Sequence, residues 1–409
     1  MKNKYFLTAV CMYLNYIVIG VSVIILSMNM DALMEQFGTD RTGFGLVVSG
    51  IGIGKFIVLF ISGVLSDKFG RKPFILIGMV GFIVYFMGIL FSPSVPVALF
   101  FAVLAGMCNS FIDAGTYPAL MEIFPTSAGT ANLAIKFFSA AGQFIMPFIF
   151  SFIIQRNLNY SLSFYIVIGY LVLNIVFMFT RGFPALSTKS GAAEKEVKRT
   201  FYEKPKMAIE GVCLILMGFT STTIFTVVQV WMAKVAEEYA GMSVAAASKM
   251  LTYFSLGVVI GVFVTGYLVR DRVRPIVICL IYPLITMVCL IALTIAPSPL
   301  LCFITVMVTG FTSGMLQLGL TTMAELFQGS KGKITGMVYS LNSIAVFSAP
   351  VITGWLATTN TMNTMVYNAA VSGLAFVLAL IVFVRYKKVF GPEAFISMKE
   401  ITNLAEASK

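Results

Sequence analysis

Histidine is absent from this sequence, and charged residues make up only 11% of it. Without histidine, the chain cannot form a Ser-His or Cys-His catalytic pair, an HExxH zinc site or a histidine proton relay. Its six cysteines contain no CxxC pair, and we expect them to pack as small apolar residues. No nucleophile with a neighbouring base is evident either. We therefore expect no metal, no organic cofactor and no enzymatic activity.

Apolar residues are abundant instead. They make up 59% of the chain, whose mean hydropathy is +0.94, whereas soluble domains carry about 25% charged residues. Apolar stretches recur that are long enough to cross a hydrocarbon core of about 30 Å as helices. The sequence therefore predicts an all-α membrane protein with twelve transmembrane helices, at 6–30, 43–66, 74–92, 97–121, 131–154, 162–181, 207–232, 244–269, 276–295, 300–323, 336–357 and 365–385.

The basic residues are distributed unevenly between the two sides of these spans. Most of the 28 Lys and Arg fall in the termini and in the loops that would share their side. Because basic loops stay in the cytoplasm, both termini are predicted to be cytoplasmic. The net charge of +11 is then a consequence of topology, and we expect the lipid bilayer rather than nucleic acid as a partner.

The chain contains an internal repeat with an offset of 203 residues. Gly63 matches Gly266, Arg71 matches Arg274, and the string MEIFPTSAG corresponds to AELFQGSKG. Such a duplication is typical of one large class of transporters. It predicts two six-helix bundles, at 1–181 and 207–385, joined by a polar cytoplasmic linker at 182–206 and followed by a cytoplasmic tail at 386–409.

The loop between the second and third predicted spans carries the most specific motif, GVLSDKFGRK at residues 63–72. It resembles the signature of the major facilitator superfamily at the same loop, and this resemblance extends over essentially the whole chain. The resemblance implies the fold of that superfamily and secondary active transport by alternating access. In the superfamily, the acid and the arginine of this loop act as a cytoplasmic latch.

The resemblance places a latch on this chain that consists of Gly63, Asp67, Gly70, Arg71 and Glu122, together with Glu325 as the counterpart of Glu122. Arg71 is expected to pair with Glu122, which ends a neighbouring span on the same side. The alternative is a short loop whose basic residues merely satisfy the preference for positive charge inside. The second copy of the motif has its acid, Asp271, one residue late, so a weaker latch is expected there.

A longer segment, NSFIDAGTYPALMEIFPTSAGTANLAIKFFSAAGQFIMP at 109–147, is similar to a group of bacterial inner-membrane facilitators encoded near shikimate and quinate metabolism. That group resembles proton-coupled importers of sugars and sugar acids. The resemblance implies a multi-pass protein of the bacterial inner membrane that transports a small hydroxylated molecule.

Three ionisable residues fall well inside spans, namely Lys55, Asp113 and Lys136. A charge at mid-bilayer costs roughly 2.5–3.5 kcal/mol, so each must face a cavity or a partner. Asn109, Asp113 and Tyr117 share one helix face by their spacing, and Lys136 shares another with Gln143. The two interpretations are a structural Asp–Lys pair and a site for substrate and protons, and they do not exclude each other.

The second half offers hydrogen-bonding groups where the first half offers charge. Gln317 stands near the position that corresponds to Asp113, and Tyr339 corresponds to Lys136. The predicted substrate and proton site is therefore Lys55, Asn109, Asp113, Tyr117, Lys136, Gln143, Gln317, Tyr339 and Asn342.

These patterns favour a monomeric, proton-coupled importer of a small polar metabolite, an anionic and hydroxylated one such as shikimate, quinate or a sugar acid. The alternative within transport is a proton-coupled exporter of a metabolite or a drug. Drug exporters of the superfamily tend to carry an arginine in the fourth span, and this chain has none there. A non-transporting sensor is a remote alternative, because it would need a soluble output domain and the longest polar segments here are the linker and the tail. Sodium coupling also stays open.

Overall fold

The computed structural model describes residues 4–124, 128–184, 201–271, 273–327 and 331–395. In these ranges a few side chains, including those of Asp67 and Asp271, are outside the description, and most of the predicted linker and tail lies outside the ranges themselves. The described residues are helical and contain no strand. They include twelve helices that are long and apolar enough to cross a membrane, as the sequence predicts.

The first half of the chain contains six of these twelve helices and one short helix. The short helix is α2 (Met30–Phe37); the others are α1 (Phe6–Met28), α3 (Arg41–Phe69), α4 (Arg71–Phe91), α5 (Val95–Ile123), α6 (Ala128–Gln155) and α7 (Ser161–Phe179). Helices are the expected solution, because an open chain in lipid must satisfy every backbone polar group internally. Asp40 caps α3 by accepting a hydrogen bond from the Gly43 amide at 3.0 Å, and Gly38 ends α2 in the left-handed conformation.

The second half repeats this arrangement with more interruptions. Its helices are η1 (Met207–Gly211), α8 (Val212–Ala240), α9 (Val244–Ser248), α10 (Met250–Asp271), α11 (Pro275–Ile295), α12 (Pro299–Phe311), η2 (Thr312–Gly314), α13 (Met315–Leu326), α14 (Lys331–Thr359), α15 (Asn363–Phe390) and η3 (Gly391–Glu393). The tenth span, which hydropathy predicts as one helix, is broken by the single 3₁₀ turn η2. The last helix continues to Phe390, past the predicted end at 385, because Val389 and Phe390 are buried and two lysines suit its C-terminal dipole.

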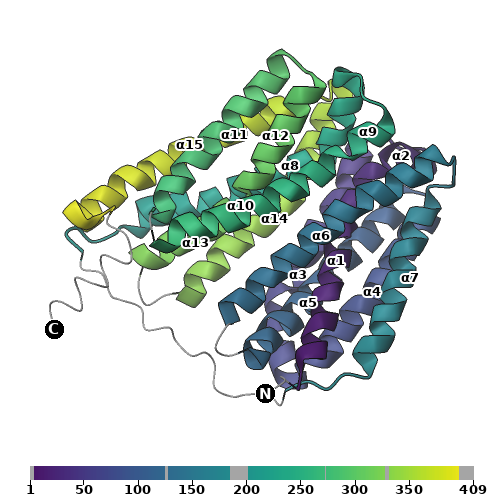
Figure 1. The fold of residues 1–409 in the computed structure, drawn as a ribbon, viewed down its shortest axis with the longest axis horizontal. Helices are drawn as coiled ribbons and strands as arrows, with labels where there is room; N and C mark the ends of the chain where they lie inside the picture. The colour runs from purple at the N-terminus through teal and green to yellow at the C-terminus, as the bar shows by residue number, and fades with distance from the viewer. Residues whose placement is uncertain (1–3, 125–127, 185–200, 272, 328–330, 396–409) are drawn as a thin grey trace.

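The two halves pack as neighbouring bundles (Figure 1). α3 packs against α14, α6 against α10, and α1 against α8. The α3–α14 contact is close enough to require glycine. A Cβ atom on Gly52 would lie 2.4 Å from the Phe347 amide nitrogen, and one on Gly45 would lie 2.3 Å from the Pro350 carbonyl oxygen.

With an even number of crossings, α1 begins and α15 ends on the same face of the protein, which we call the terminal face; the opposite face is the distal face. Charged contacts between the bundles are found at the distal face. Arg41, at the start of α3, pairs with Glu238 of α8 and donates to the Ala357 carbonyl at 3.0 Å and to Thr361. Lys234 of α8 reaches Asp31 of α2 at 2.8 Å.

A further contact lies deeper, where the Thr252 hydroxyl of α10 donates to the Phe144 carbonyl of α6 at 3.2 Å. The distal end of the interface is therefore held by charge-assisted hydrogen bonds between the bundles. We call the residues Asp31, Arg41, Lys234, Glu238 and Thr361 the distal clamp.

Replacing Arg41 with glutamine should loosen the distal clamp, because it removes the ion pair that joins the bundles. Arg41 and Glu238 are about one quarter exposed, so the expected loss is about 1 kcal/mol, or roughly five-fold in favour of the distal-open form. Electron–electron resonance between spin labels on cysteines at exposed Glu35 and Val244, in a Cys289→Ser background, would measure the shift to longer distances.

Arg156→Gln is the matched control, because Arg156 is exposed near the same face and its recorded contact is with Phe152 of its own helix. An unchanged distance distribution in Arg41→Gln would show that the distal clamp does not hold this interface closed.

Candidate functional site

Asp113 of α5 is the centre of a buried charge cluster in the first bundle. One of its carboxylate oxygens lies 3.0 Å from the Lys55 Nζ of α3, and the other accepts a hydrogen bond from the Tyr16 hydroxyl of α1 at 2.7 Å. Tyr16 is 3% exposed, whereas about a fifth of the Asp113 side chain and a quarter of the Lys55 side chain are accessible. Three helices are thus joined through one carboxylate.

Two more predicted residues approach this cluster from other helices. Lys136 of α6 lies within electrostatic range of both Lys55 and Asp113. Tyr339 of α14, from the second bundle, also lies within range of that pair and is 36% exposed. The Lys136 side chain is exposed. Charged and polar residues of both bundles therefore lie near one another at this level of the spans.

The neighbours of Asp113 on α5 belong to the same centre. Tyr117 packs its ring edge-to-face against Tyr16, with ring centroids 6.3 Å apart. The side-chain oxygen of Asn109 is buried and has no hydrogen-bond partner among the described residues. Because buried amide oxygens are normally satisfied, this atom is a candidate acceptor for a ligand hydroxyl.

The remaining predicted residues are less closely tied to the cluster. Asn342 of α14 accepts a hydrogen bond from Thr222 of α8 within the second bundle. Gln143 and Gln317 are half-buried, and no hydrogen bond joins their side chains to other described residues. Tyr16, which the structure places against Asp113, is missing from the predicted site. A tyrosine in an apolar first span is the sequence signal that could have pointed to it.

Two of the predicted latch residues, Arg71 and Glu122, form an ion pair on the terminal face. Arg71 lies 3.3 Å from Glu122 and donates to Ser66, whose own hydroxyl donates to the Ala114 carbonyl at 2.9 Å. Gly70 joins α3 to α4 with a φ of +94°, a conformation that side chains rarely adopt. A Cβ on Gly63 would touch nothing within 4 Å, so this arrangement does not itself require glycine there.

The second bundle keeps the corresponding pair despite the shifted acid of its motif. Arg274, which is 2% exposed, lies 3.6 Å from Glu325, and Glu325 also accepts a hydrogen bond from Tyr386 of α15. Both halves therefore place an arginine beside an acid that ends the fourth or tenth span. The contacts of the two motif aspartates fall outside the described side chains.

A third charge cluster on the terminal face is absent from the sequence prediction. The fully buried Glu210 of η1 lies 2.8 Å from Arg385 of α15, which also reaches Glu203 at 2.9 Å. The hydrogen bond from Arg385 holds the pKa of Glu203 below its usual value. The Tyr202 amide donates to the Val389 carbonyl at 2.8 Å, so the chain that enters α8 is attached to the end of α15.

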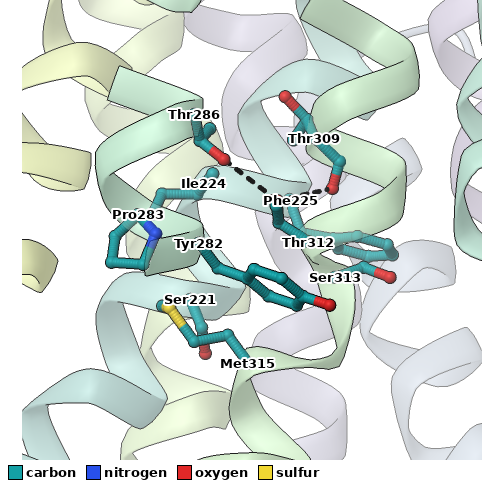
Figure 2. A pocket seen from close by; sticks show the side chains of 10 residues that line it. All are labelled: Ser221, Ile224, Phe225, Tyr282, Pro283, Thr286, Thr309, Thr312, Ser313 and Met315. Atoms are coloured by element: carbon teal, nitrogen blue, oxygen red, sulfur yellow. Dashed lines mark hydrogen bonds between the residues drawn. The ribbon is translucent and has the colours of Figure 1, made fainter. Parts of the chain in front are cut away.

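A small hydroxyl-lined cavity lies inside the second bundle, beside the break in the tenth span (Figure 2). Its volume of about 10 Å³ for water centres admits about one water molecule. Thr286 and Thr312 share a hydrogen bond of 2.9 Å at its wall, and Ser221 donates to its own helix. Thr312, which lines this cavity, is the repeat counterpart of Asn109 in the first bundle.

Arg385→Met should destabilise the second bundle, because it leaves the buried Glu210 carboxylate without its guanidinium. Removing one partner of a buried ion pair costs about 3–5 kcal/mol of stability. Because the Arg385 side chain is partly exposed, the expected loss is smaller, roughly 2 kcal/mol. Thermal unfolding of the purified protein in detergent should show a melting temperature lower by several degrees.

The exposed Lys387→Gln is the control for a lost positive charge on the same helix. The double variant Glu210→Gln with Arg385→Met should recover most of the stability. A double variant as unstable as Arg385→Met alone would rule out the uncompensated carboxylate as the cause.

Comparisons with known proteins agree with the fold and with the motif. The profile of the Major Facilitator Superfamily matches residues 6–325 and 214–400. The inner membrane transport protein YdiM of Escherichia coli (strain K12) is 39% identical over 95% of this chain and 96% of its own. The MFS-type transporter YfkL of Bacillus subtilis (strain 168) is 37% identical over 95% and 98%.

Solved structures share the architecture at low sequence identity. The D-xylose-proton symporter has a TM-score of 0.73 at 15% identity, covering 93% of this chain and 97% of its own. A point mutant of the nucleoside transporter NupG has a TM-score of 0.74 at 11% identity, covering 93% and 100%. With two near full-length relatives above 30% identity and a superfamily profile over both halves, the chain belongs to the Major Facilitator Superfamily and is a secondary transporter of that superfamily.

Proposed function

We propose that this transporter imports a small hydroxylated anion together with protons across the bacterial inner membrane. In this proposal the terminal face is cytoplasmic, the chain works as a monomer, and the two bundles rock about the polar centre to expose it to one side at a time. Shikimate, quinate and sugar acids are the class of substrate that we expect. The preference for basic residues on the terminal face supports the orientation.

The observation that carries the proposal is the accessible Lys55–Asp113 pair in the middle of the membrane spans. An ion pair with a purely structural role can be fully buried, whereas both of these side chains are partly accessible to solvent. A carboxylate whose partner is a lysine can exchange that partner for a proton when an anionic substrate attracts the lysine. This exchange couples a proton to the substrate without any further group.

The state of the bundles is consistent with an importer that has closed its outer side. The distal clamp joins the bundles on the face that the proposal assigns to the periplasm. The Arg71–Glu122 and Arg274–Glu325 pairs each lie within one bundle on the terminal face, and we propose that they form the cytoplasmic latch. The D-xylose-proton symporter shares the fold and carries D-xylose with protons, which supports the proposed coupling.

Vesicles that contain the purified protein should accumulate labelled shikimate or quinate when the outside is more acidic than the inside. Asp113→Asn should abolish this accumulation, because the amide cannot take up the coupled proton, while exchange of substrate across the membrane persists. Glu35→Gln, which removes an exposed carboxylate on α2, is the matched control for a lost negative charge.

Accumulation by Asp113→Asn equal to that of the wild type would exclude Asp113 as the coupling carboxylate. Accumulation only with the opposite gradient would indicate a proton-coupled exporter.

A further inference from the structure

The two lysines of the polar centre differ in what they contact. Lys55 forms an ion pair with one carboxylate oxygen of Asp113 at 3.0 Å, and the second oxygen accepts a hydrogen bond from Tyr16. Lys136 is exposed, and within the described ranges no hydrogen bond or ion pair joins it to another residue. Its nearest recorded charges are the already paired Lys55 and Asp113. The positive charge of Lys136 is therefore left uncompensated by the described part of the protein.

The charge balance of the centre follows from these contacts. Two lysines and one carboxylate leave a single positive charge, because Asp113 can neutralise only one of them. Glu122, the next acid on α5, is engaged with Arg71 on the terminal face and does not reach this level. A charge in a low-dielectric site is costly unless it is paired. One negative charge from a ligand would remove this cost, and a second would have no partner.

On the basis of the proposed function, we propose that the two lysines have separate roles. Lys136 anchors the carboxylate of a singly charged substrate, whereas Lys55 holds and releases the proton-coupling carboxylate of Asp113. The substrate is a hydroxylated monocarboxylate: the unsatisfied Asn109 oxygen lies one helical turn from Asp113 on α5 and accepts one of its hydroxyls. Tyr339 approaches the same ligand from the second bundle.

This arrangement fixes the electrical character of transport. The bound substrate brings one negative charge, and the proton taken up by Asp113 brings one positive charge. The loaded centre therefore carries the same net charge as the empty one. Transport of one monoanion with one proton moves no net charge, so the pH gradient drives it and the membrane potential does not.

The first experiment measures binding to the purified protein by thermal shift, with shikimate, quinate and gluconate as probes. The uncharged sugar D-xylose and the dicarboxylate succinate are the comparison ligands. Monocarboxylates should stabilise the wild type. Lys136→Gln should weaken their binding at least ten-fold, and Lys136→Arg should retain most of it. Asp113→Asn, which leaves both lysines charged, should still bind them. The exposed Lys387→Gln controls for a lost positive charge elsewhere.

The second experiment measures uptake of the monocarboxylate that binds, in vesicles where a potassium gradient with valinomycin sets the membrane potential independently of pH. Uptake should rise at least five-fold with an acidic exterior and change less than two-fold with a negative interior at equal pH. Asp113→Asn should bind substrate but lose the response to the pH gradient.

Each result decides a separate claim. Unchanged monocarboxylate binding in Lys136→Gln, or stabilisation by D-xylose and by none of the acids, would overturn the anchor. Potential-driven uptake at equal pH would overturn electroneutral coupling. Binding lost in Lys136→Gln without any response of wild-type uptake to the pH gradient would keep the anchor and reject the proposed proton coupling.

Discussion

The ion pair between Lys55 and Asp113 is the interaction on which the centre of this protein depends. In a hydrocarbon layer, each of these charges alone would cost several kcal/mol, so the two must remain together or be replaced by other partners. They sit on different helices, and Tyr16 brings a third helix to the same carboxylate. In the proposed mechanism, proton uptake at Asp113 acts directly on the packing of α1, α3 and α5, because the three helices meet at its carboxylate.

The repeat in the chain is a repeat of architecture, and the chemistry of the two halves has diverged. The first bundle concentrates lysine and aspartate near the membrane centre, whereas the second offers Tyr339, amides and the hydroxyl-lined cavity beside η2. Neutral hydrogen-bonding groups cost less to bury than charges, so the second bundle can present them without pairing partners. A ligand at the proposed site would meet charge from the first bundle and hydrogen-bonding groups from the second.

The two faces of the protein also differ in which helices their ion pairs join. On the distal face, ion pairs cross from one bundle to the other, whereas on the terminal face the described pairs stay within a bundle. Partly exposed pairs of this kind each contribute about 1 kcal/mol or less, which is enough to favour one arrangement and little enough to be reversed. The closely packed glycines between α3 and α14 add a contact that tolerates no side chain.

The sequence by itself determined the twelve membrane helices and their two-fold repeat. Both follow from local properties: an apolar run of about twenty residues can only be a helix in lipid, and a duplicated sequence folds into duplicated structure. It also singled out Lys55, Asp113 and Lys136, because any charge in such a run demands a reason. The superfamily motif added Arg71, and the end of a neighbouring span on the same side added Glu122.

Only the tertiary structure decided which of these residues meet. Helix rotation is invisible to hydropathy, so the choice of Lys55 rather than Lys136 as the partner of Asp113 could not be made from spacing. The same applies to Tyr16, to the Glu210–Arg385 pair and to the distal clamp, in which contacting residues lie up to 320 positions apart in the chain. The break at η2 was not predicted either, because the three small residues Thr312–Gly314 barely lower the hydropathy of a long apolar span. Local chemistry determined the elements, and packing between distant helices determined the site.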